Sequence, residues 1–238
     1  LEGEEFTSIK RLFDEMQIHK NDLLNGHVQM PVYRGTQLDE LIDTKKNYDP
    51  SFRHLLHQLK SPEEQVYELP EQLQASLRNY QMTGFRWFKS LSNYHLGGIL
   101  ADDMGLGKTL QSIAYIASEK EQKGAEPNLI IAPSSVVYNW KNEFEKFAPH
   151  LSVVVLTGSP EERQQLIEAS IGTDVWITSY ATLRQDIEIY REFSFQSMIL
   201  DEAQYIKNYA TKTSQAIREI KAARRFALSG TPIENSID

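Results

Sequence analysis

Short apolar runs alternate with helical patterns from residue 97 onward, and this alternation limits the fold more than any other feature of the sequence. Expected strands cover 97–101, 128–132, 152–156, 174–178, 197–201 and 225–229. Expected helices lie between them at 108–120, 135–147, 161–169, 181–191 and 211–223. Strands that are apolar almost throughout are typical of a parallel sheet covered by helices on both faces. We therefore predict an α/β fold that binds ligands at the carboxyl ends of its strands.

Composition excludes several classes of protein. The 238 residues contain no cysteine, which rules out disulfides, thiol catalysis and cysteine zinc sites. No apolar run approaches the roughly 20 residues of a membrane span, so we expect no membrane partner. The first residue is Leu1, and the last residues, "TPIENSID", carry no helix-end signal, so we expect an excerpt of a longer protein.

The net charge of −8 is concentrated at the front of the chain. Residues 1–75 hold 14 acids and 8 bases, and residues 76–238 hold 19 acids and 17 bases. This shift predicts an acidic helical segment over 1–70 and a nearly neutral body over 71–238. In the front segment His54 and His57 share a helix face, but without a third ligand they favour a packed or solvated role over a metal site.

The stretch "ADDMGLGKTLQ" follows the first expected strand. Gly105 and Gly107 allow a loop to wrap closely, so that backbone N–H groups and the start of the next helix can face phosphate oxygens. Lys108 would reach the β- and γ-phosphates, and the Thr109 hydroxyl would bind Mg²⁺. Asp102 stands where the usual pattern has its first glycine. The alternative is a glycine-rich turn with a surface lysine, which the strand before and helix after disfavour.

A second polar strand end is Asp201-Glu202, after the apolar run "SMIL". Adjacent carboxylates at a strand end are costly without a partner or a task. In a nucleotide hydrolase the first binds Mg²⁺, and the second orients or deprotonates the attacking water. The alternative is a solvated turn, which the phosphate-type loop earlier in the chain makes less favourable.

Other polar positions leave two interpretations open. The "PSS" sequence at 133–135 and the "TSY" sequence at 178–180 each lie between an expected strand and helix. Their hydroxyls suit a sugar-phosphate contact or a helix N-cap equally well. Gln81 offers the donor and acceptor pair that adenine requires, but the residues alone favour an exposed helical glutamine.

Together, these segments resemble the helicase-like ATPases of superfamily two, in particular the SWI/SNF branch and its bacterial relatives. "LRNYQMTGFRWF" is similar to the adenine-recognition motif, "ILADDMGLGKTLQ" to motif I and "IIAPSSVVYNW" to motif Ia. "WITSYATLR" is similar to motif Ib, "LDEAQYIKN" to motif II and "ALSGTPIEN" to motif III. Motif II reads DEAQ, which disfavours a DEAD-box RNA helicase. The resemblance implies a RecA-like P-loop NTPase lobe with ATP and Mg²⁺ as cofactors.

The resemblance also assigns residues to roles. Lys108, Asp201 and Glu202 would be catalytic, and Thr109 and Asp201 would bind Mg²⁺. ATP contacts would come from Arg78, Gln81, Asp103, Met104, Gly105, Leu106, Gly107, Lys108, Thr109 and Leu110. Nucleic-acid contacts would come from Pro133, Ser134, Ser135, Trp140, Thr178, Ser179 and Tyr180. Ser229, Gly230 and Thr231 would couple the two sites.

The implied activity is ATP-driven movement along double-stranded DNA. Its expected partners are duplex DNA, a second RecA-like lobe that supplies arginine fingers, and a DNA-bound protein target. Because loss of an arginine finger costs about 10³–10⁵ in rate, we expect the isolated chain to be nearly inactive. Alternatives are an RNA helicase, a restriction-type translocase or a nucleotide sensor without hydrolysis. The expected location is the cytoplasm, with the nucleoid in a bacterium, or the nucleus in a eukaryote.

Overall fold

The computed structural model describes residues 67–93, 98–101, 107–124, 126–203 and 211–229. Most of the acidic front segment, with His54 and His57, lies outside these ranges. Among the described helices, none is long and apolar enough to cross a membrane.

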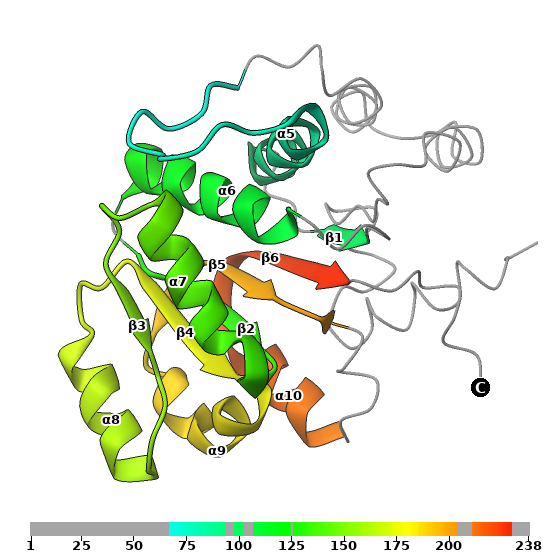
Figure 1. Ribbon diagram of the computed structural model, residues 1–238. Coiled ribbons are helices and arrows are strands. Elements are labelled where there is room, and N and C mark those ends of the chain that lie inside the picture. The colour runs from blue at the N-terminus through cyan, green and yellow to red at the C-terminus, as the bar shows by residue number, and fades with distance from the viewer. Residues whose placement is uncertain (1–66, 94–97, 102–106, 125, 204–210, 230–238) are drawn as a thin grey trace, which may run out of the picture.

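Six parallel strands form one sheet (Figure 1). They are β1 (Gly98–Ala101), β2 (Asn128–Ala132), β3 (Val153–Val155), β4 (Val175–Ser179), β5 (Ser194–Leu200) and β6 (Lys221–Ser229). Their order across the sheet is β1-β6-β5-β2-β4-β3, and every neighbouring pair runs parallel. The predicted α/β class with a parallel sheet is confirmed.

Helices cover both faces of this sheet. They are α5 (Asn79–Asn93), α6 (Lys108–Lys123), α7 (Val137–Phe147), α8 (Pro160–Ala169), α9 (Tyr180–Tyr190) and α10 (Thr211–Glu219), and a short 3₁₀ helix, η2 (Ser134–Val136), leads into α7. One core joins α5, α6 and α7 to strand residues such as Ile130, and a second joins α8, α9 and α10 to their alternate neighbours such as Ile131. Figure 1 shows the two groups of helices on opposite sides of the sheet.

Strand register aligns the carboxyl ends of five strands along one edge. Ala101 of β1 pairs with Ser229 of β6, and Ala132 of β2 pairs with Ser179 of β4. The backbone N–H of Asp201 donates to the carbonyl oxygen of Ile131 at 2.8 Å, which continues the β2–β5 pairing by one residue. The segments that follow β1, β2, β4, β5 and β6 therefore leave the sheet from the same edge.

The last predicted helix was too long. Instead of reaching residue 223, α10 ends at Glu219, and β6 begins at Lys221 because Lys221 and Ala222 pair with the first residues of β5. This pairing overrides the helical preference of the alanines at 222 and 223. The Arg225 guanidinium donates to the carbonyls of Ile217 and Ile220, which caps the end of α10.

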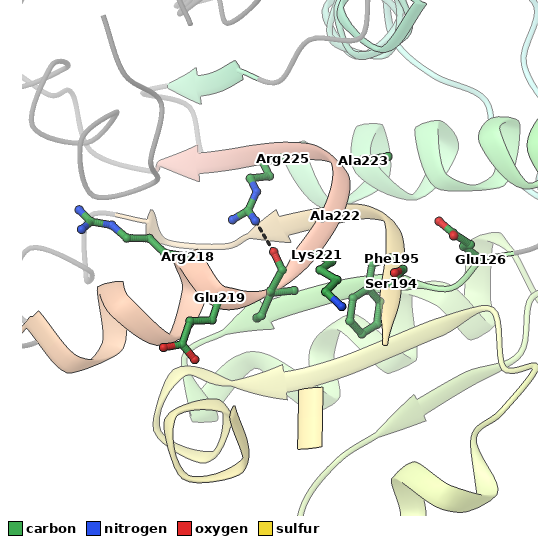
Figure 2. A pocket seen from close by; sticks show the side chains of 10 residues that line it. Glu126, Ser194, Phe195, Arg218, Glu219, Lys221, Ala222, Ala223 and Arg225 are labelled. Atoms are coloured by element: carbon green, nitrogen blue, oxygen red, sulfur yellow. Dashed lines mark hydrogen bonds between the residues drawn. The ribbon is translucent and has the colours of Figure 1, made fainter. Parts of the chain in front are cut away.

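An open hollow of about 500 Å³ lies beside this turn (Figure 2). It is lined by the first residues of β5 and β6 and by the end of α10, among them Phe195, Arg218 and Lys221. It therefore lies at the amino-terminal edge of the sheet, opposite the strand ends that carry the predicted motifs.

Candidate nucleotide-binding site

The turn into α6 has the conformation that an anion-binding helix start requires. Gly107 is its N-cap, with φ of 103° in the left-handed region that glycine tolerates, and Lys108 is the first helical residue. No side chain caps this turn in the described structure. The first N–H groups of α6 and its positive dipole end therefore suit a phosphate group.

The neighbouring predicted ATP residues are described only in part. Lys108 and Leu110 are buried and Thr109 is partly exposed. Asp103, Met104, Gly105 and Leu106 lie outside the described residues, so the predicted wrap of the loop stays a prediction.

Gln81 lies against the phosphate-type turn. A Cβ placed on Gly107 would come 2.7 Å from the Gln81 Nε2 atom, so the absence of a side chain at Gly107 makes room for this amide. The Gln81 Oε1 atom accepts a hydrogen bond from the Arg78 backbone N–H at 2.9 Å, and the Gln81 side chain is buried. The alternative of an exposed glutamine is therefore wrong, whereas adenine recognition by Gln81 and the exposed Arg78 stays a prediction.

Three donors hold Asp201 at the end of β5. The Trp140 indole N–H donates to its Oδ2 atom at 2.7 Å, and the Glu202 backbone N–H donates to its Oδ1 atom at 2.9 Å. The Tyr180 hydroxyl donates to the Asp201 carbonyl oxygen at 2.6 Å. Both carboxylate oxygens and the backbone carbonyl oxygen of Asp201 thus each accept a hydrogen bond.

The pKa of the Asp201 carboxyl is raised, with burial as the largest cause. The hydrogen bond from Trp140 opposes this shift, the charge of Glu202 adds to it, and the positive charge of Lys108 opposes it. The helix start after β1 and the acid after β5 lie at the same edge of the parallel sheet, and their joint binding of a metal ion and a phosphate stays a prediction.

Glu202 has an unusual backbone. Its φ of 48° is the one positive value at a non-glycine residue in the described part of the chain. Such conformations cost on the order of 1–3 kcal/mol and gather at active sites. The strain is consistent with the catalytic role predicted for Glu202.

The residues after β2 remain available for a ligand. Ser134 and Ser135 are exposed and Pro133 is partly exposed. Neither η2 nor α7 has a side-chain hydrogen bond at its N-cap. The N-cap interpretation of these serines is therefore wrong, and their contact with nucleic acid stays a prediction.

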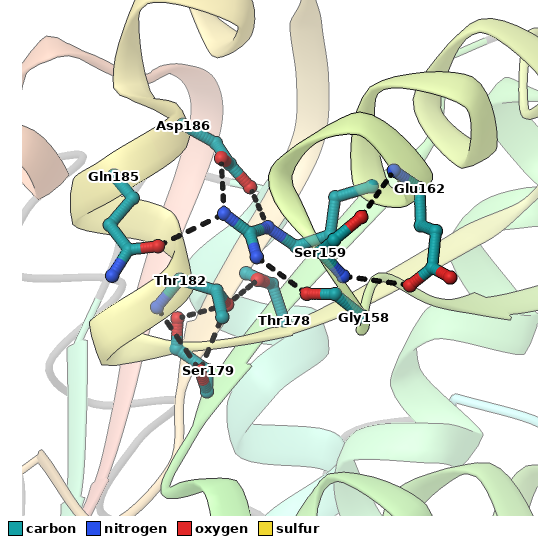
Figure 3. Close-up of polar contacts among 9 residues, drawn as sticks. Gly158, Ser159, Glu162, Thr178, Ser179, Thr182, Gln185 and Asp186 are labelled. Atoms are coloured by element: carbon teal, nitrogen blue, oxygen red, sulfur yellow. Dashed lines mark hydrogen bonds and ion pairs between the residues drawn. The ribbon is translucent and has the colours of Figure 1, made fainter.

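The residues at the end of β4 behave differently (Figure 3). The Ser179 hydroxyl accepts a hydrogen bond from the Thr182 backbone N–H at 3.2 Å and caps α9. The Thr178 hydroxyl bonds to that of Thr182 at 2.9 Å, and both Thr178 and Ser179 are buried. The N-cap interpretation of Ser179 is confirmed.

Trp140 and Tyr180 need a correction. We predicted nucleic-acid contacts for both, but each side chain is only 1% exposed, so neither ring is available at the surface. The Trp140 indole N–H and the Tyr180 hydroxyl donate hydrogen bonds to Asp201 instead. Sequence reasoning missed these two contacts because they join residues 61 and 21 positions apart, and no local pattern signals them.

Two further predictions concern the end of β6 and the metal ligands. Ser229 ends β6, level with Ala101 at the end of β1, whereas Gly230 and Thr231 lie outside the described residues. Among the described residues no three His, Cys, Asp or Glu side chains form a metal-binding group.

A parallel sheet with an anion-binding helix start after one strand and an acidic pair after another defines a nucleotide-binding lobe of the RecA-like class. The model of the SNF2-related domain matches residues 80–238, which is about two thirds of the chain. The chain therefore belongs to the SNF2-related family, and the predicted resemblance is confirmed. A second model, described as bacterial SNF2 helicase associated, matches residues 1–70.

Known proteins with high similarity support this assignment. The TATA-binding protein-associated factor MOT1 of Saccharomyces cerevisiae is 40% identical over 198 residues, covering 78% of this chain and 11% of MOT1. Helicase SWR1 of the same yeast is 43% identical over 175 residues, covering 71% of this chain and 11% of SWR1.

A solved structure, the Sulfolobus solfataricus SWI2/SNF2 ATPase core in complex with dsDNA, is 42% identical with a TM-score of 0.65. The match covers 72% of this chain and 35% of that one. The chain thus spans about a tenth of the length of these curated relatives, and it corresponds to the first RecA-like lobe of an SNF2-type ATPase.

Proposed function

We propose that this chain is the ATP-binding lobe of a DNA-dependent translocase, which hydrolyses ATP with Mg²⁺ and moves along duplex DNA when a second RecA-like lobe completes it. The observation that carries the proposal is that Lys108, at the start of α6, and the partly buried acid Asp201, after β5, lie at the same edge of the parallel sheet. A cation at a helix start and a carboxylate that can bind a metal ion are parts that nucleotide hydrolysis requires.

Each residue has a definite task in this proposal. Lys108 and the first N–H groups of α6 hold the phosphates, and Gln81 and the exposed Arg78 bind the adenine, an assignment that the approach of the Gln81 amide to Gly107 supports. Thr109 and Asp201 hold Mg²⁺, which neutralises phosphate charge when bound. Glu202 orients the attacking water.

The proposed DNA contact rests on the surface after β2 and on family membership. Ser134 and Ser135 lie exposed at the same sheet edge, and their hydroxyls are not used as helix caps. Hydroxyls and N–H groups contact phosphates without regard to base sequence, as a motor that moves along DNA requires. The Sulfolobus ATPase core, which was solved with dsDNA, supports duplex DNA as the ligand.

The test uses the full-length protein and measures phosphate release with duplex DNA, single-stranded DNA or RNA. We expect duplex DNA to stimulate turnover, and Lys108→Ala or Glu202→Gln to abolish that stimulation. Lys221→Ala, which changes an exposed lysine at the opposite sheet edge, serves as the control and should retain it. Retained turnover in Lys108→Ala would refute the proposed site.

Two other outcomes would redirect the proposal. Stimulation by RNA alone would favour an RNA helicase over a DNA motor. Binding of a fluorescent ATP analogue without phosphate release under any condition would favour a nucleotide sensor. The isolated 238-residue chain should bind nucleotide weakly and turn it over slowly, since arginine fingers contribute about 10³–10⁵ in rate; robust DNA-stimulated turnover would contradict this.

A further inference from the structure

Asp201, the predicted metal ligand, accepts hydrogen bonds from two aromatic side chains of two different helices. Trp140 lies on α7, which follows β2, and Tyr180 is the first residue of α9, which follows β4. Their N–H and O–H groups donate to the side chain and to the backbone carbonyl of Asp201, at 2.7 and 2.6 Å. A short donor to a carboxylate is stronger than a neutral hydrogen bond and fixes its direction.

Packing alone does not require the Trp140 hydrogen bond. The chain has three tryptophans, and all three rings are buried. In the described structure the indole N–H groups of Trp87 and Trp176 have no hydrogen-bond partner. This core therefore tolerates an unpaired indole N–H, although such a group is costly. The pairing of Trp140 with Asp201 is a specific feature of the site.

We propose that Trp140 and Tyr180 are positioning residues for Asp201: Trp140 holds its carboxylate in the metal-binding orientation, and Tyr180 holds its backbone carbonyl. The inference rests on the proposed function, because it assumes that Asp201 binds the metal. The residues that orient a metal ligand typically change metal affinity by about 10–100-fold when they are lost. Trp140→Phe removes the donor and keeps an aromatic ring near Phe144, whose centroid lies 6.2 Å from that of Trp140.

The chain offers a closely matched control. Trp176 is as buried as Trp140, at 1% exposed, but its N–H has no partner in the described residues. Trp176→Phe therefore makes the same chemical change at the same depth without removing a hydrogen bond. A loss of metal affinity that both variants share would come from changed packing. A loss confined to Trp140→Phe would come from the missing hydrogen bond to Asp201.

The first experiment measures Mn²⁺ binding to the full-length protein with ADP, by electron paramagnetic resonance. We expect Trp140→Phe to weaken Mn²⁺ about 10–100-fold and Tyr180→Phe to weaken it to a lesser extent. ADP affinity in the presence of EDTA should stay unchanged, and Trp176→Phe should bind Mn²⁺ like the wild type. If the wild type binds no Mn²⁺ with ADP, the proposed function fails; if Trp140→Phe equals Trp176→Phe, only this inference fails.

The second experiment tests the contact without nucleotide. In the ¹⁵N-labelled 238-residue chain, Asp201→Ala should move the indole resonance of Trp140 and speed its hydrogen exchange. The resonances of Trp87 and Trp176 should stay in place, and the three are assigned by single Trp→Phe substitutions. If all three move together or none moves, the proposed hold on Asp201 is refuted.

Discussion

The ion pair between Arg163 and Asp186 joins α8 to α9, and it gives the sharpest test of what holds this lobe together. The Arg163 Nε atom lies 2.6 Å from Asp186 Oδ2, and Nη2 lies 2.9 Å from Oδ1 (Figure 3). The guanidinium also donates to the Gly158 carbonyl at 2.7 Å and to Gln185 Oε1 at 3.0 Å. The two side chains are 3% and 5% exposed. Removing one partner therefore leaves a buried charge without compensation.

Arg163→Met tests this contact, because methionine fills similar space without the charge. Breaking a buried, bidentate pair costs about 3–5 kcal/mol of the free energy of unfolding. With a urea m-value of about 2 kcal/mol/M, the midpoint should fall by about 1.5–2.5 M. Circular dichroism during urea unfolding measures this, provided that the m-value is unchanged.

Two further variants make the test decisive. Arg163→Met combined with Asp186→Leu removes both charges, and should recover most of the lost stability. Arg191→Met breaks an equally short pair with Glu219, but those side chains are 45% and 40% exposed, so its midpoint should change little. If Arg163→Met shifts the midpoint no more than Arg191→Met, or if the double variant is as unstable as the single one, burial is not the source of the effect.

Three other substitutions follow from the structure. Gly84→Ala would place a Cβ 1.8 Å from Gln111 Oε1 between α5 and α6, and because the Gln111 side chain is buried, this overlap should outweigh the roughly 1 kcal/mol gain in helix propensity and lower the free energy of unfolding by about 1–2 kcal/mol in urea titration. Gly107→Ala forces an L side chain to a φ of 103°, which costs about 1–2 kcal/mol of backbone strain. Its main effect should be weaker binding of a fluorescent ADP, and its effect on the melting temperature should be the smaller one. The pKa of Asp174 is lowered from its usual 3.8, because the ion pair with Lys120 and other hydrogen bonds outweigh the effect of burial. Its contribution to stability is therefore present at neutral pH and lost as pH falls below about 4, so Asp174→Asn should melt lower than wild type at pH 7 and approach it near pH 3.

The sequence was sufficient for features that depend on local pattern. The strand at 128–132 is observed with the predicted bounds, because five consecutive buried residues bounded by turns have few other solutions. The start of β6 was not predictable in the same way. Lys221 and Ala222 read as the end of a helix, and only the partner strand β5 makes them a strand. Propensity is local, whereas strand pairing joins distant segments.

The site shows the same division between local and distant information. Hydroxyl residues lie just after β2 and at the end of β4, and from sequence both sets suit either a helix cap or a phosphate contact. The structure separates them, because Ser179 caps α9 directly, whereas η2 intervenes before α7 and leaves Ser134 exposed. The position of the first helical turn relative to the strand end decides the outcome, and single-sequence patterns locate helix starts poorly.

The sheet edge explains why the two predicted surfaces are physically joined. Strand β5 lies beside β2, and β4 lies on the other side of β2, so the helices that follow β2 and β4 both begin near the end of β5. Trp140 and Tyr180 then reach Asp201 from the two segments that carry the predicted nucleic-acid motifs. A displacement of the start of α7 or of α9 must therefore strain a hydrogen bond to Asp201, the predicted metal ligand. The order of the parallel strands therefore lets two single side chains, Trp140 and Tyr180, connect the segments of the predicted DNA surface with Asp201 of the predicted nucleotide site.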